Sequence, residues 1–90
     1  MAEVEVRELR ISARTADKLR EKHDLAAEEV REAVEGVGGL QFRWDDHPER
    51  GLRAILVTAV GARAVQVVLY PALDEPADVW NLGSAYPVDS

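Results

Sequence analysis

The sequence predicts an α+β domain in which two short N-terminal helices pack on one face of a four- to five-stranded antiparallel meander sheet. Residues 53–70 form the one long apolar run of the chain and are typical of two strands joined by a glycine turn. Residues 12–35 instead carry apolar side chains at helical spacing. Helices followed by a run of strands are typical of α+β domains, which fixes the predicted class.

The predicted hairpin between Arg53 and Tyr70 is the element around which the remaining chain is expected to fold. Apolar residues alternate on both faces of its two strands, and Gly61 can adopt the positive φ that a tight turn requires. Strands that are apolar on both faces favour a central position in the sheet. We therefore expect the other strands to flank this pair.

The helical region divides into two helices. Ser12 is a good N-cap for a helix over Ala13–His23, because its hydroxyl can accept a hydrogen bond from a first-turn N–H. A second helix is predicted over Ala27–Glu35, with Glu28 and Glu29 at the positive end of its dipole. The glycines of residues 36–39 end it; they lack the following Gly-Lys-Ser/Thr that a phosphate-binding loop needs.

Three further segments alternate as strands do. Leu40–Asp45 has an aromatic inner face, and Asp78–Tyr86 forms the last predicted strand before Pro87. Val4–Ile11 also alternates, but its period breaks at residues 7–8, which is compatible with a bulge or with an early helical turn.

Composition limits the functions that this chain can have. Ninety residues suffice for one domain, residues 1–90, with one core. With 11 Lys and Arg against 17 Asp and Glu, the net charge of −6 argues against a protein that grips long nucleic acid. The chain has no cysteine, no signal peptide and no membrane-spanning run, so we expect a cytoplasmic protein without a membrane partner.

Several short motifs together resemble the BrnT-like branch of the RelE/ParE toxin superfamily and its uncharacterised small-domain relatives. The resemblance covers about residues 9–88, although Asp24 stands where the family has glycine. The matching residues are Lys22-His23-Asp24-Leu25, Glu28-Glu29-Val30, Arg53, Gly61-Ala62-Arg63, Val67-Val68-Leu69-Tyr70 and Ser84-Ala85-Tyr86-Pro87.

This resemblance implies a RelE/ParE-like fold and a small endoribonuclease that cleaves messenger RNA without a metal. It also implies that the partner is a cognate antitoxin encoded beside it. Cleavage through the 2′-hydroxyl needs a base, a cation near the phosphate and an acid for the leaving oxygen.

The candidate residues for this chemistry are few. His23 is the best base because histidine titrates near neutral pH. Arg53 and Arg63 are candidate phosphate clamps, but they are expected at opposite ends of the hairpin, so Arg53 with Tyr70 is the more coherent pair. The predicted catalytic residues are His23, Arg53 and Tyr70, and the predicted substrate-binding residues are Lys22, Arg63 and Tyr86.

Each candidate also has a purely structural interpretation. His23 is then a helix-end residue, the arginines are surface charges, and the tyrosines lie at the edge of the core. The acidic loop of residues 45–49 lacks recognised metal-ligand spacing, and Trp44 and Trp80 favour the core over base stacking. We therefore predict neither a metal nor a cofactor.

Two functional hypotheses remain open. The first is a ribonuclease-like toxin that acts on RNA. The second is a non-catalytic protein-interaction module on the same scaffold, in which an edge strand such as Val79–Ala85 pairs with a partner or with a second copy as a homodimer.

Overall fold

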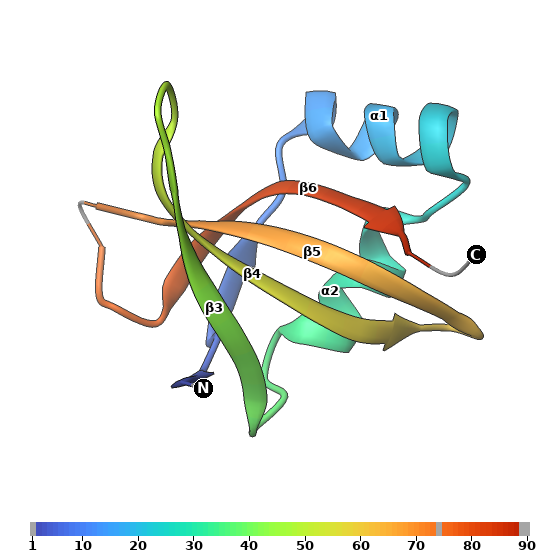
Figure 1. Cartoon of the computed structure of the whole chain (residues 1–90). Helices are drawn as coiled ribbons and strands as arrows, with labels where there is room; N and C mark the ends of the chain where they lie inside the picture. The colour runs from blue at the N-terminus through green and yellow to red at the C-terminus, as the bar shows by residue number, and fades with distance from the viewer. Residues whose placement is uncertain (1, 74, 89–90) are drawn as a thin grey trace.

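The protein has two helices and six strands among the residues that the computed structural model describes, which are 2–73 and 75–88 (Figure 1). The α+β class is therefore confirmed. In chain order the elements are β1 (Ala2–Val4), β2 (Glu8–Arg10), α1 (Ala13–His23), α2 (Ala27–Val34), β3 (Leu40–His47), β4 (Gly51–Val60), β5 (Arg63–Pro71) and β6 (Val79–Pro87).

The sheet is mixed and has the strand order β1-β3-β4-β5-β6-β2. Strands β3 to β6 form the predicted antiparallel meander, with the hairpin β4–β5 at its centre. The expectation of four to five strands that are all antiparallel is wrong, because β1 joins one edge and β2 joins the other edge in parallel to β6. Parallel pairing requires a long connection, here supplied by most of the chain, and local sequence patterns do not reveal such a connection.

The N-terminal segment forms two short strands, β1 and β2, which are separated where the spacing of its apolar residues changes. Val4, Val6 and Leu9 are all buried, so the inward spacing changes from two residues to three between Val6 and Leu9. At this step the N–H groups of Arg7 and Glu8 donate to the carbonyl oxygen of Asp78, at 2.9 and 3.4 Å. The segment therefore pairs with β3 before this step and with β6 after it. The sheet curls, so that both of its edge strands come from this one segment.

The side chains of Arg31 in α2 and of Glu35, which directly follows the helix, complete the outer edge of β2. The carboxylate of Glu35 accepts from the N–H of Leu9 at 2.8 Å, and Arg31 donates to the carbonyl oxygen of Leu9. Arg31 and Glu35 also pair with each other at 3.2 Å. The hydrogen bond from Leu9 is the main cause that lowers the pKa of Glu35, with Arg31 as a smaller one, against the opposing effect of burial. The backbone of an edge strand is therefore paired without another strand.

Both helices form as predicted and cover the curled sheet. Ser12 caps α1 by accepting from the N–H of Thr15 at 3.1 Å, and Asp24 ends it in the left-handed conformation with φ of 52°. Helix α1 lies along β6, while α2 packs against β4 (Figure 1). The core is wholly apolar among the described residues, and its largest fully buried side chains are Leu9, Leu19, Leu69, Val6, Val30, Val34, Val65, Val67 and Val79.

Neither helix combines the length and the apolar character that crossing a bilayer would require, among the residues that the structure describes.

We predict that Glu35→Ala lowers the free energy of unfolding by about 1 kcal/mol at pH 7, since the N–H of Leu9 loses its acceptor. The folded state holds the pKa of Glu35 below its ordinary value of 4.5, so the carboxylate stabilises the fold above that pH. This contribution is lost as the pH falls through the lowered pKa. Urea unfolding should therefore show a gap between wild type and variant that narrows from pH 7 to pH 3.

Glu32→Ala is the matched control, because Glu32 is an exposed carboxylate on the same helix. It should change the free energy of unfolding by less than about 0.5 kcal/mol. Equal effects of the two substitutions, or a gap that does not depend on pH, would contradict the assignment.

Candidate functional site

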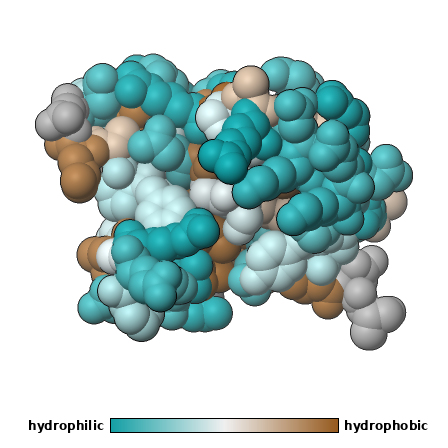
Figure 2. All heavy atoms as spheres, turned by 90° about the horizontal axis from the view of Figure 1, so that it is seen from above, coloured by the Kyte–Doolittle hydropathy of each residue, from teal (hydrophilic) through white to brown (hydrophobic). Residues whose placement is uncertain are grey.

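A cationic groove lies between α1 and the β3–β4 hairpin, over the outer side of β6. Seen from above, the surface is hollowed between the hydrophilic mass of α1 and the hairpin (Figure 2). The groove has a volume of about 200 Å³. The residues that give it its chemistry are Lys18, Lys22 and His23 from α1, Arg50 from the hairpin, and Gly83 and Ser84 from β6.

The helical spacing of Lys18 and Lys22 in α1 places both lysines at the groove. Leu19 is buried and fixes which side of the helix faces the core, so Lys18 and Lys22 lie along its border one turn apart. Both lysines are exposed, and the ion pairs within the described part of the chain involve neither of them. Their charges are therefore available to a ligand.

Arg50 reaches the groove from the opposite side because of the turn that carries it. The Nδ1 atom of His47 accepts from the N–H groups of Glu49 and Arg50, both at 3.1 Å. Gly51 follows with a φ of 80°, which few other residues adopt. His47 thus serves as a turn-stabilising acceptor, a role that the sequence pattern did not reveal.

His23 ends α1 at the groove and lies half-buried beside Tyr86, with 6.1 Å between the two ring centroids. The side-chain amide of Gln66 donates to the hydroxyl oxygen of Tyr86, which leaves the hydroxyl proton free to be donated. Arg63 donates to the carbonyl oxygens of His23 and Asp24, at 2.9 and 3.3 Å. Arg63 therefore caps the negative end of α1 from below the groove.

Arg53 and Tyr70 lie together at the other end of the hairpin, as their positions in the sequence predicted. The register pairs Arg53 with Asp45 and Arg63 with Val60, which separates the two arginines. The Nε atom of Arg53 lies 2.6 Å from a carboxylate oxygen of Asp45. Asp45 first, and the Tyr70 hydroxyl second, raise the pKa of Arg53 above its ordinary value. The charge of Arg53 is thus largely neutralised within the protein.

Tyr70 borders the groove because its ring lies against Gly83. A Cβ atom built on Gly83 would lie 2.2 Å from Cε2 of Tyr70 and 3.3 Å from the carbonyl oxygen of Val68. Gly83 also coincides with the register shift between β5 and β6. The glycine therefore permits the close approach of the tyrosine at the border of the groove.

The structure thus brings His23 and Lys22 to one groove, with Tyr86 beside His23 and Tyr70 against Gly83 at its border. It adds Lys18 and Arg50, which the sequence reasoning missed. The position of Lys18 could have been found from its spacing to Lys22 beside buried Leu19, whereas no local signal links Arg50 to α1.

The two tryptophans have different environments. Trp80 is buried, as expected, but Trp44 is 48% exposed and stands edge-on to Phe42 with 4.9 Å between ring centroids. The core prediction for Trp44 is wrong, because β3 extends beyond the core toward the hairpin tip.

Compared with known proteins, the chain matches no protein-family model, no curated protein and no solved structure.

We predict that Gly83→Ala destabilises the protein by about 1 to 3 kcal/mol, because the added methyl group would overlap the ring of Tyr70. In a double-mutant cycle followed by thermal or urea unfolding, Tyr70→Ala should remove most of that cost. Gly38→Ala is the control, since nothing lies within 4 Å of its Cβ position. If the cost of Gly83→Ala persists without Tyr70, the tyrosine does not require the glycine.

Proposed function

We propose that the cationic groove binds the phosphodiester backbone of RNA and that the protein is a toxin-like, metal-independent endoribonuclease. The observation that carries this proposal is the charge of the groove. Lys18, Lys22, Arg50 and His23 converge there, and no carboxylate lines it among the residues that the structure describes, although the chain as a whole has a net charge of −6. A local excess of cations in an acidic protein is what an RNA site on this chain requires.

The size of the groove indicates how much RNA it engages. Three permanent cations can neutralise only a few phosphates, in contrast to the long basic tracks of proteins that bind nucleic acid non-specifically. Lysines lie on one wall and Arg50 on the other, so a backbone that runs along the groove would be held from both sides. Arg50 can form a bidentate contact with a phosphate, and the lysines act as point charges.

The proposed reaction uses side chains that line or border the groove. His23 takes the proton of a 2′-hydroxyl, whose oxygen forms a new bond to the adjacent phosphorus. The bond from phosphorus to the 5′-oxygen breaks, and the leaving oxygen takes a proton from Tyr86, whose own oxygen already accepts from Gln66. Lys22 and Arg50 stabilise the charge that develops on the phosphoryl oxygens. The products are a cyclic phosphate and a free 5′-hydroxyl.

In this proposal Arg53 has a different role from the catalytic one that the sequence predicts. Its pairing with Asp45 makes it a support for Tyr70 rather than a phosphate clamp, and Arg50 takes the clamping role. Tyr70 is placed to stack a base that enters the end of the groove at Gly83. Within this proposal an antitoxin would neutralise the protein by covering the groove.

A non-catalytic interaction module is the second candidate function. It is favoured by strand β4 in the middle of the sheet, whose pairing with β3 ends at Ile55.

We predict that Lys22→Ala weakens binding of a short fluorescein-labelled single-stranded RNA by about tenfold at low salt, since it removes one charge-assisted phosphate contact. Fluorescence anisotropy at several salt concentrations should also show a salt slope reduced by about 0.7. Arg14→Ala removes one positive charge from the same helix outside the groove and should leave binding nearly unchanged. Equal weakening by both variants would point to net charge rather than to the groove.

We predict that His23→Ala and Arg50→Ala each lower RNA cleavage by about a hundredfold or more without loss of folding. Induced expression in a bacterial host should arrest growth and degrade total RNA with the native chain but not with either variant. Arg53→Ala tests the revised assignment, because it should lower stability more than cleavage. No growth effect of the native chain at confirmed soluble expression would exclude the ribonuclease and favour the interaction module.

A further inference from the structure

Strand β4 loses its neighbour on one side halfway along its length. The pairing of β3 with β4 runs from His47↔Gly51 to Arg43↔Ile55 and stops there. The first residues of β3 turn away to pair with β1, with Phe42 opposite Ala2. On its other side β4 remains paired with β5 as far as Val60. From Leu56 onward, alternate backbone N–H and C=O groups of β4 therefore point toward the side where no strand lies among the described residues.

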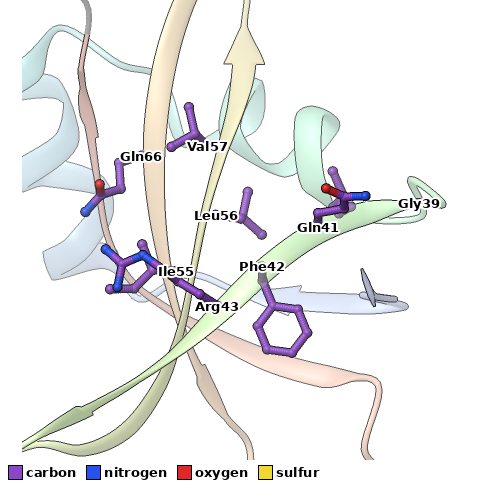
Figure 3. A pocket seen from close by; sticks show the side chains of 9 residues that line it. Gly39, Gln41, Phe42, Arg43, Ile55, Leu56, Val57 and Gln66 are labelled. Carbon is purple, nitrogen blue, oxygen red and sulfur yellow. The ribbon is translucent and has the colours of Figure 1, made fainter. Parts of the chain in front are cut away.

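A groove of about 460 Å³ occupies the fork between the two strands. Figure 3 shows β3 and β4 diverging, with Gln41 on one strand and Leu56 and Val57 on the other. Phe42 points away from the fork into the aromatic cluster with Trp44. The groove lies on the outer face of the sheet, apart from the cationic groove, and the two share no lining residue.

The groove combines an apolar floor with charges at its two ends. Val57 is 57% exposed although it lies in the middle of the central hairpin, and Ile55 lies beside it on the same face. Arg43 is exposed and stands outside the ion pairs within the described residues. At the other end, a carboxylate oxygen of Glu3 lies 3.9 Å from the Cβ position of Gly39. Between these ends, the polar side chains among the described lining residues are the amides of Gln41 and Gln66.

We propose that this fork binds an extended segment of a partner polypeptide, which adds as a strand to the free edge of β4 from Leu56 onward. The backbone of β4 supplies hydrogen bonds, and the floor of Ile55 and Val57 receives apolar side chains at alternate positions. Charge complementarity identifies the segment: it carries an acidic side chain beside Arg43 and a basic side chain beside Glu3. The opposite charges at the two ends also fix the direction in which the segment runs.

An extended peptide fits the fork better than a compact ligand does. The groove follows the diverging strands, and along its wall β4 presents backbone groups, spaced as in a sheet, that have no partner strand among the described residues. The part of β4 that β3 leaves unpaired runs only from Leu56 to the end of the strand at Val60, and in the turn that follows the Glu29 carboxylate of α2 lies 3.5 Å from the Cβ position of Gly61. The accessible edge is therefore short, and it accommodates one added strand of a few residues rather than a second sheet.

The test is a titration of the full, isotope-labelled chain with a synthetic probe, followed by heteronuclear NMR. The probe is an octapeptide of alternating threonine and valine with one glutamate near one end and one lysine near the other. We expect amide shifts at Leu56, Val57 and residues 40–43, with little change along α1. The same peptide, N-methylated at alternate backbone nitrogens, should bind at least about tenfold more weakly, because it cannot complete the ladder of hydrogen bonds.

Charge reversal tests the direction of binding. Arg43→Glu should weaken binding of the probe by about fivefold, and a peptide with arginine in place of its glutamate should recover that loss. Lys22→Ala, in the other groove, is the control and should leave peptide binding unchanged. Arg43 is exposed, so its replacement should preserve the dispersion of the spectrum.

Three results would overturn the proposal. The first is the absence of shifts at the fork at saturating peptide, and the second is equal binding of the N-methylated probe. The third is a concentration-dependent shift of Leu56 and Val57 without peptide, which would show that a second copy of the chain occupies the edge. Because each readout is binding at the fork, the outcome does not depend on whether the protein cleaves RNA.

Discussion

The sharing of one N-terminal segment between the two edges of the sheet is the constraint on which the rest of this structure depends. The segment pairs with β3 before its break and with β6 after it, so the sheet must curl until these two strands are both within reach. Hydrogen bonds from Arg7 and Glu8 to Asp78 hold the crossing point. The Arg31–Glu35 pair then satisfies the backbone of Leu9, so the short β2 needs no further strand beside it. Without the Arg31–Glu35 pair, β2 would be a weakly held edge strand, because only three of its residues pair with β6.

Both grooves follow from this curl. Because β3 bends away to meet β1, it leaves β4 at Ile55 and opens the fork on the outer face. Because β6 is bound along its first residues by β2, α1 lies along the remainder of that strand and faces the hairpin tip across it. Gly83 completes the arrangement, since its missing side chain lets Tyr70 lie flat at the end of the cationic groove. The same distortion that closes the core thus creates both grooves.

Local features of this chain could be predicted from sequence because local physics determines them. Ser12 as a helix cap, the end of α1 at His23 and the central hairpin all depend on neighbours within a few residues. The separation of Arg53 from Arg63 follows from strand register alone. By contrast, the parallel pairing of β2 with β6 joins residues about 71 apart, as in the contact of Arg7 with Asp78. The approach of Arg50 to Lys18 and Lys22 depends on that same curl, so no periodicity in the sequence could indicate it.

The sequence also does not indicate which charged side chains are engaged by other groups of the protein. Arg53 and Arg63 look like the better phosphate ligands because they stand in the central hairpin, yet each is engaged within the protein, one by Asp45 and the other by carbonyl oxygens at the end of α1. Lys18 and Lys22 look like ordinary solvated residues of an amphipathic helix, yet they line the groove together with Arg50, and the ion pairs among the described residues involve none of the three. Local patterns identify charged residues, whereas only tertiary packing decides which of those charges remain unpaired.

The net charge and the cationic groove are compatible because electrostatic screening acts over a shorter distance than the size of the protein. The molecule measures 30 × 26 × 24 Å, whereas the screening length at physiological ionic strength is about 8 Å. In the proposed RNA site, most of the 17 carboxylate side chains would therefore have little effect on a phosphate between Lys22 and Arg50. They act instead on the approach of a polyanion, which the overall negative charge slows at low salt. A site of this kind binds through close contacts made after arrival, so the positions of its few cations, rather than their number, determine what it holds.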